Sequence, residues 1–207
     1  AALADGNSAA VRNTRTYAML GLSRAESDDA WTALASLAAD SPEPTRSSAL
    51  RYLLKAPPLQ AVQDARLAAA RAGDSSVTTR SSAVRQLVDA KHPEADTLLG
   101  ELIERPEVMR SNGTHSDVLS ALLTSFGPRY YDAFLTVGGA VRPSARKPFE
   151  KEIAGLTAAH PSFAAGLSEN LTRRDVPAER CFGLELLNPV PGSEVTDLLL
   201  AESRARE

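Results

Sequence analysis

The stretch that decides the fold is Thr45-Arg46-Ser47-Ser48-Ala49-Leu50-Arg51-Tyr52-Leu53, which recurs as Thr79-Arg80-Ser81-Ser82-Ala83-Val84-Arg85-Gln86-Leu87. Seven of the nine positions are identical, and the two copies lie 34 residues apart. A weaker copy, Thr14-Arg15-Thr16-Tyr17-Ala18-Met19, precedes them, and a degenerate copy begins at Thr114. Self-similarity at a fixed period of this length is typical of solenoids, in which each repeat is one supersecondary unit.

Prolines follow the same period. Pro58, Pro93, Pro128, Pro161 and Pro191 are separated by 35, 35, 33 and 30 residues, and each begins an apolar periodic stretch. Proline is tolerated in the first turn of a helix because its missing N–H would have no partner within the helix there. These prolines therefore mark the start of one helix in each period.

The composition favours helices throughout. The 207 residues include 35 Ala and 27 Leu but only 10 aromatic residues, and Ala and Leu form helices more readily than strands. Together with the repeat, this predicts an all-α protein, an α-α superhelix (solenoid) of about six antiparallel helix pairs that fills residues 1–207 as a single domain. The expected first helices are 44–55, 77–91, 114–126, 145–159 and 177–188, and the expected second helices are 58–71, 93–105, 129–140, 161–173 and 193–205.

Two segments share a more specific pattern. In Asp40–Leu50 and in Asp74–Val84, an acidic turn is followed by an Arg, two further residues, an Ala and a Leu-rich helix. This order resembles the HEAT-like (armadillo/HEAT) repeat family of α-solenoids, and Val11-Arg12 is a looser match. The resemblance is sharp between residues 40 and 105, and the Arg is lost after Asn112-Gly113.

The resemblance also implies a role for the repeated arginines. In such solenoids the Arg is usually the structural partner of the acidic turn of a neighbouring repeat, through charge-assisted hydrogen bonds. An anion-binding stripe is the alternative role. The residues expected to form the structural ladder are Asp40, Arg46, Asp74 and Arg80.

The bulk properties exclude several classes of protein. The formal net charge is −3, which argues against a protein that coats phosphate backbones and makes nucleic acid an improbable partner. Cys181 is the only cysteine, so an internal disulfide is impossible. No apolar run approaches the length of a membrane span, and the chain begins with Ala and has no signal-peptide pattern. We expect a segment of a longer polypeptide, with the cytoplasm as the favoured compartment.

The patterns that carry chemistry are missing. There is no glycine-rich phosphate loop and no nucleophile elbow. The histidines are His92, His115 and His160; none precedes a Glu, and none has a second His three or four residues away. Metal-site spacing is therefore absent, and we predict no catalytic, cofactor-binding or metal-binding residue.

One irregular stretch is rich in aromatic residues. The segment Phe126–Phe134 holds four of the ten aromatics. On a helix Tyr130 and Phe134 share one face, and Tyr131 points about 100° away, so one of the two tyrosines should be partly exposed. Exposed aromatics are typical binding anchors, although packing of both tyrosines in the core is the favoured alternative. The candidate partner-binding residues are Arg129, Tyr130, Tyr131 and Trp31.

Two functions compete. The first is a non-enzymatic scaffold that binds a protein partner, or an adjacent domain of the same polypeptide, on a concave face lined by the second helices. The second is a nucleic-acid-binding or DNA-base-processing protein, since some HEAT-like solenoids resemble DNA-base glycosylases. A continuous positive groove containing Trp31 or Tyr131 would favour the second function, and a groove of mixed charge would favour the first.

Overall fold

The structure is a computed structural model that describes residues 9–111 and 113–187. Every regular element in these two ranges is a helix, so the all-α class predicted from the Ala and Leu content is confirmed. The chain divides into two compact units, residues 1–102 and 103–207. Each unit is described below by itself.

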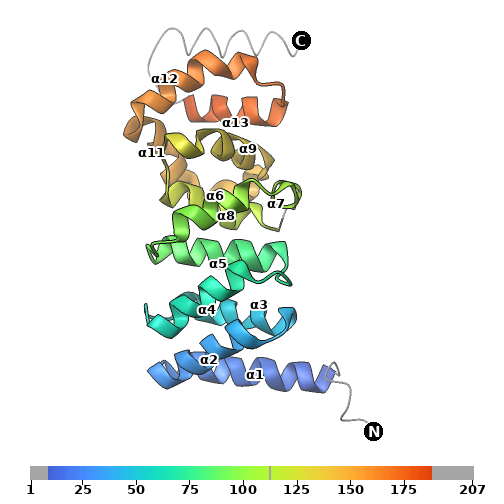
Figure 1. Ribbon diagram of the computed structural model, residues 1–207. Helices are drawn as coiled ribbons and strands as arrows, with labels where there is room; N and C mark the ends of the chain where they lie inside the picture. Colours follow the sequence, from blue (N-terminus) through green and yellow to red (C-terminus); the bar gives the residue numbers. More distant parts are fainter. Residues whose placement is uncertain (1–8, 112, 188–207) are drawn as a thin grey trace. The chain divides into compact units, whose positions relative to one another are not determined.

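Unit 1 is built from two sets of packed helices. The helices α1, α3 and α5 pack on one another in that order, and α2 packs most extensively on α4 (Figure 1). The two sets are joined because α2 also packs on α3, and α4 on α5. The elements are α1 (Ala9–Ala25), α2 (Asp28–Asp40), α3 (Glu43–Tyr52), η1 (Leu53–Lys55), α4 (Gln60–Arg71), α5 (Val77–Asp89) and α6 (Ala95–Ile103), whose last residue belongs to unit 2.

Local sequence explains where these helices begin and end. The side chains of Ser27 and Ser76 accept hydrogen bonds from Ala30 N and Thr79 N, which caps α2 and α5. Each such cap stabilises a helix by about 1 kcal/mol. Helix α5 ends where Lys91 adopts a left-handed conformation, with a φ of 54°, so that His92 N donates to Leu87 O at 2.9 Å.

The core of unit 1 combines large and small apolar side chains. Leu34, Leu50 and Leu87 are fully buried, and Trp31 is 4% exposed. Buried alanines of the repeated motif, such as Ala49, allow close approach of neighbouring helices because they carry only a methyl group. The buried apolar residues of α2 to α5 therefore lie on helices that pack on one another.

Unit 2 has a different pattern of packing. Helix α9 packs most extensively on α13, and it also packs on α8, while α11 packs on α12 and α13. The elements of unit 2 are α7 (Pro106–Arg110), α8 (His115–Thr124), η2 (Pro128–Tyr130), α9 (Tyr131–Ala140), α10 (Pro143–Arg146), η3 (Lys147–Phe149), α11 (Glu150–Ala159), α12 (Pro161–Asn170), η4 (Leu171–Arg173) and α13 (Pro177–Leu187).

Glycine makes the contact between α9 and α13 possible. A Cβ atom on Gly138 would lie 2.0 Å from Cε1 of Phe182, and one on Gly139 would lie 2.9 Å from the carbonyl carbon of Ala178. Real Cβ contacts are longer than this, so a larger residue at Gly139 would force the two backbones apart. The tight packing of α9 on α13 therefore depends on the Gly138-Gly139 pair.

The observed helices lie close to the expected ranges. Pro161 is the first residue of α12, whereas Pro58 precedes the first residue of α4 by two positions. The short helices α7 and α10 were not expected. The expected helix 193–205 and Pro191 lie outside the described residues.

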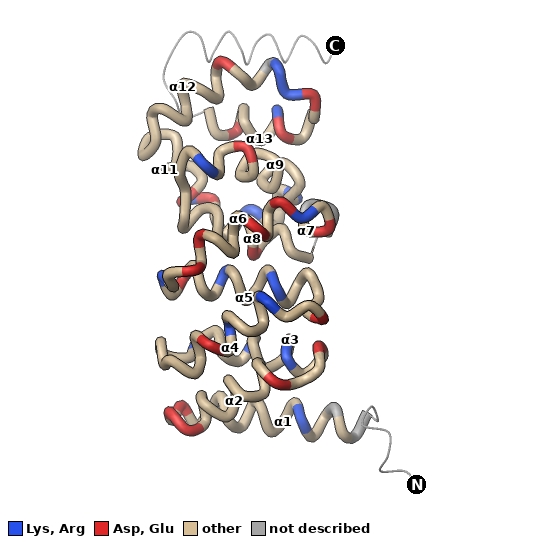
Figure 2. Tube along the Cα trace, in the orientation of Figure 1, with Lys and Arg blue, Asp and Glu red and all other residues tan. Residues whose placement is uncertain are grey.

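Charged residues of both signs are interspersed along the two units (Figure 2). Among the described residues no helix is long and apolar enough to cross a membrane.

Candidate functional site

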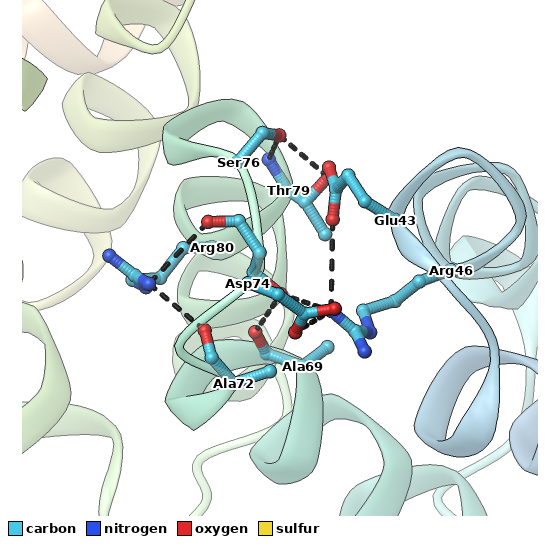
Figure 3. Close-up of polar contacts among 9 residues, drawn as sticks. Glu43, Arg46, Ala69, Ala72, Asp74, Ser76, Thr79 and Arg80 are labelled. Atoms are coloured by element: carbon cyan, nitrogen blue, oxygen red, sulfur yellow. Dashed lines mark hydrogen bonds and ion pairs between the residues drawn. The ribbon is translucent and has the colours of Figure 1, made fainter.

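Arg46 forms the centre of a polar network in unit 1. Its Nη1 atom donates to Oδ1 of Asp74 at 2.7 Å and to Oγ of Ser75 at 3.0 Å, and Ser75 Oγ donates to Ala69 O at 2.9 Å (Figure 3). Arg46 lies on α3 and Asp74 in the turn after α4. The Arg of one repeat thus reaches the acidic turn of the next repeat, which is the geometry that the ladder requires for this pair. The hydrogen bond from Arg46 lowers the pKa of Asp74 below its usual value of 3.8.

The other expected ladder residues have different surroundings. Arg80 is buried, and its Nη2 atom donates to Ala72 O at 3.0 Å, a carbonyl at the end of α4 (Figure 3). Asp40 is exposed at the last position of α2. In the weaker copy of the motif, Arg15 Nη1 donates to Thr45 Oγ1 at 2.9 Å. The repeated arginines are therefore held by protein groups inside unit 1.

A groove of about 780 Å³ lies in unit 2. It is bounded by α9, by α12 and by the connection from α12 to α13. Its apolar lining comes from Tyr131 and Leu135 of α9 and from Phe163 and Leu167 of α12. Helix α9 itself packs extensively on α13.

Tyr131 is one of the two aromatic residues that line this groove. Its ring is half-buried, stacks on Phe126 with centroids 5.1 Å apart, and lies 4.5 Å from the ring of Phe163. Tyr130, by contrast, is only 2% exposed. Burial thus differs between Tyr130, which belongs to η2, and Tyr131, the first residue of α9, whereas packing of both tyrosines in the core was the favoured alternative.

The remaining candidate contact residues lie elsewhere. Arg129 is exposed, and its guanidinium lies 5.4 Å from the centre of the Tyr130 ring. Trp31 belongs to α2 of unit 1 and is buried in its core. The side chains of Tyr130 and Trp31 are therefore out of reach of a partner in this conformation, and Tyr131 is the candidate that lines a cavity.

The polar rim of the groove is partly neutralised. Arg174 forms ion pairs with Asp132 and with Glu179, the latter at 3.0 Å. Arg173 is exposed and has no hydrogen-bond or ion-pair partner among the residues that the structure describes. The groove thus offers one unpaired guanidinium beside an apolar floor.

Arg146, by contrast, bonds to protein groups within unit 2. Arg146 is buried; it donates to the carbonyl oxygens of Gly138 at 2.8 Å and Val141 at 3.0 Å, and it forms a bidentate ion pair with Glu185. Its guanidinium also lies 4.9 Å from the centre of the Phe182 ring. Arg146 caps the carboxyl end of α9 and ties it to α13.

Two histidines follow the ends of helices, and His115 is the first residue of α8. His160 follows the last residue of α11, and its ring lies 4.7 Å from that of Phe126. His92 follows α5, and its Nδ1 atom accepts a hydrogen bond from Glu94 N. Within the described ranges, no three His, Cys, Asp or Glu side chains are grouped as metal ligands.

Sequence reasoning missed several residues of the groove. Phe163 and Leu167 lie four positions apart after the helix-starting Pro161, so their shared face was a usable signal. The difference between Arg173 and its paired neighbour Arg174 depends on contacts of Arg174 with α9 and α13. Arg66, which lines a cavity in unit 1, was also missed, although it sits between Val62 and Ala69 on the apolar face of its helix.

Comparisons with protein-family models, with curated proteins and with solved structures find no match to this chain. Any functional proposal therefore rests on the residues and the geometry described above.

Proposed function

We propose that this protein is a non-enzymatic protein-binding scaffold of HEAT-like repeats. In this proposal the period of about 34 residues continues through the chain as about six helix pairs that stack as a solenoid. The two sets of packed helices in unit 1 support it, and so does the Arg46–Asp74 contact between successive copies of the motif. Stacked helix pairs bury their apolar faces against neighbours and leave extended surfaces for partners.

The half-buried Tyr131 in the groove of unit 2 is the observation that carries the proposal. Rigid aromatic side chains that are partly exposed beside an apolar floor are typical binding hot spots, because they bury a large area at a small cost in conformational entropy. The groove also lies between α9 and α12, which match two of the expected second helices. The scaffold hypothesis places its binding surface on the second helices.

The chemistry of the rim defines the partner. Arg173 is the guanidinium without a partner among the described residues, whereas Asp132 and Glu179 are already paired with Arg174. The occupant is therefore a protein segment with an aromatic or large aliphatic side chain for the apolar floor and a nearby carboxylate for Arg173. Its apolar side chain would pack on Tyr131 and Phe163.

The charge of the groove disfavours the nucleic-acid alternative. Arg173 and Arg174 share the rim with Asp132, Asp175 and Glu179. A binding surface for phosphate backbones needs a continuous excess of positive charge. Anisotropy titration with labelled single-stranded DNA at low salt tests this alternative, for which we expect no saturable binding.

Site-specific cross-linking tests the scaffold proposal. A benzoylphenylalanine in place of Tyr131 should cross-link a protein in the lysate of the source cells, and the same probe in place of the exposed Ala154 on α11 serves as the control. The captured protein is then purified, and its affinity is measured for the unmodified chain and for Tyr131→Ala and Arg173→Glu.

We expect each substitution to weaken binding by about tenfold, which corresponds to about 1.4 kcal/mol. Lys151→Glu, which changes an exposed charge on α11, is the matched control and should leave the affinity unchanged. Equal affinity for the unmodified chain and for a folded Tyr131→Ala variant would overturn the proposal.

A further inference from the structure

A second cavity, of about 350 Å³, lies in unit 1 and contains a buried arginine. Arg66 of α4 lines this cavity and is only 5% exposed. Arg85 of α5 lines the same cavity, as do the apolar side chains of Leu54 and Pro58. Two guanidinium groups therefore share one small space with an apolar wall.

The position of the Arg66 side chain is set by two neutral acceptors. Its Nε atom donates to Oε1 of Gln86 at 3.0 Å, and its Nη2 atom donates to Leu53 O at 2.8 Å. Gln86 is itself held, because its Nε2 atom donates to Leu50 O at 3.2 Å. The guanidinium is thus oriented by the end of α3 and by α5 before any ligand arrives.

One edge of this guanidinium remains unused. Nη1 of Arg66 has no hydrogen-bond partner among the described residues and keeps a small exposed area, and Arg66 lines the cavity. No described carboxylate lies within ion-pair distance of Arg66. Burial lowers the pKa of Arg66, and the more distant Asp89 partly opposes this shift.

A buried cation without an ion pair is costly, and an oxyanion that reaches it recovers part of that cost. Arg85 provides the second cation, although its Nε atom lies 3.3 Å from Oδ2 of Asp89. Asp89 therefore competes with an external anion for the same positive charge. Leu54 is 44% exposed, unusually high for a leucine, and is available for contact with the apolar part of a ligand.

We propose that this cavity is an oxyanion-binding site. Arg66 and Arg85 bind a carboxylate or phosphate group there, and the apolar group attached to that anion packs on Leu54 and Pro58. The site is independent of the groove beside Tyr131. It gives the buried Arg66 a role beyond capping α3.

The first test uses acetate and inorganic phosphate as probes of the whole chain, with sodium chloride at the same ionic strength as the reference. We expect both anions to raise the thermal midpoint more than chloride does, since ligands of the folded state stabilise it. They should also shift the Nε–H resonance of Arg66 in NMR spectra. The proposal is overturned if the anions change the thermal midpoint and the Arg66 resonance no more than chloride does.

Variants separate a binding site from a purely structural arginine. Asp89→Asn removes the competing carboxylate and should increase the apparent affinity for phosphate at least threefold, whereas Arg85→Ala and Arg66→Lys should decrease it. Arg51→Ala removes an exposed charge of α3 outside the cavity and is the matched control. If Arg66→Lys does not fold, the test rests on Asp89→Asn. A higher affinity of this variant for phosphate supports the site, and an unchanged affinity refutes it.

Two peptides identify the source of the anion. N-acetyl-leucyl-glutamate amide presents a carboxylate beside an apolar side chain, and N-acetyl-leucyl-phosphoserine amide presents a phosphate in the same place. Tighter binding of the first identifies acidic protein segments as the ligand, and tighter binding of the second identifies phosphorylated ones. Binding of both peptides no tighter than that of acetate contradicts the proposed contact with Leu54 and Pro58.

Discussion

Arg46 on α3 and Asp74 in the turn after α4 are joined by a 2.7 Å ion pair that links two copies of the repeated motif. The guanidinium is buried and the carboxylate is largely exposed, so the aspartate brings a charged partner to Arg46 without itself losing much water. Other buried arginines cap the carboxyl ends of helices, as Arg80 does for α4 and Arg146 for α9. Within each unit, buried guanidinium groups thus form polar contacts with a neighbouring turn or helix end.

The contact between Arg46 and Asp74 predicts a pH dependence of stability. The pKa of Asp74 is lowered in the folded state by the hydrogen bond from Arg46, so its contribution is fully present above the unfolded value near 3.8. The contribution disappears as the pH falls through the lowered folded value. Thermal unfolding of the protein and of Asp74→Asn should therefore differ at pH 6 and converge near pH 2, and a constant difference would contradict the pKa shift.

Replacing glycine by alanine should have opposite effects at the contact between α9 and α13 and at an open position on α11. Gly139→Ala should destabilise the protein by about 1–3 kcal/mol, because the new Cβ would lie 2.9 Å from the backbone of Ala178. Gly155→Ala is the matched control on α11, where nothing lies within 4 Å of the new Cβ.

This control should stabilise the protein by up to about 1 kcal/mol, since alanine is a better helix former than glycine. Urea unfolding measures both changes. Equal effects at the two positions would show that α9 and α13 do not approach as closely as described.

Replacing the side chain of Arg146 by that of alanine should destabilise the protein strongly. Arg146→Ala leaves the carbonyl groups of Gly138 and Val141 without their donor and removes the ion pair with Glu185. We expect a loss of about 2–4 kcal/mol in the free energy of unfolding. Arg142→Ala, at an exposed arginine four residues earlier, should change it by less than about 0.5 kcal/mol. A similar effect of both substitutions would rule out the capping role of Arg146.

Replacing Lys91 by glycine should stabilise the protein. Its φ of 54° lies in the left-handed region, which costs a lysine about 1 kcal/mol relative to glycine. Lys91→Gly should therefore raise the thermal midpoint, whereas Lys55→Gly, at the end of η1, should not. Thermal unfolding by circular dichroism measures both variants, and a lower midpoint for Lys91→Gly would refute this expectation.

The helices and the contact between neighbouring repeats were accessible from the amino-acid pattern alone. Helix starts and ends depend on local features such as the serine caps, the prolines and the spacing of leucines, all of which can be read along the chain. The duplicated motif repeats an acidic turn and an Arg at a period of 34 residues. The resemblance to HEAT-like repeats then implied that Arg46 would pair with the acidic turn of the next copy, which contains Asp74.

Folding in three dimensions decided which side chains meet outside that regular pattern. Tyr131 of α9 and Phe163 of α12 line one groove with their rings 4.5 Å apart, and Arg66 lines a cavity while it donates to Gln86 and Leu53. These contacts join residues from different helices at 13 to 32 positions apart, and no local propensity encodes them. They follow from close packing, since the volume and shape of every neighbouring side chain determine where a helix can lie.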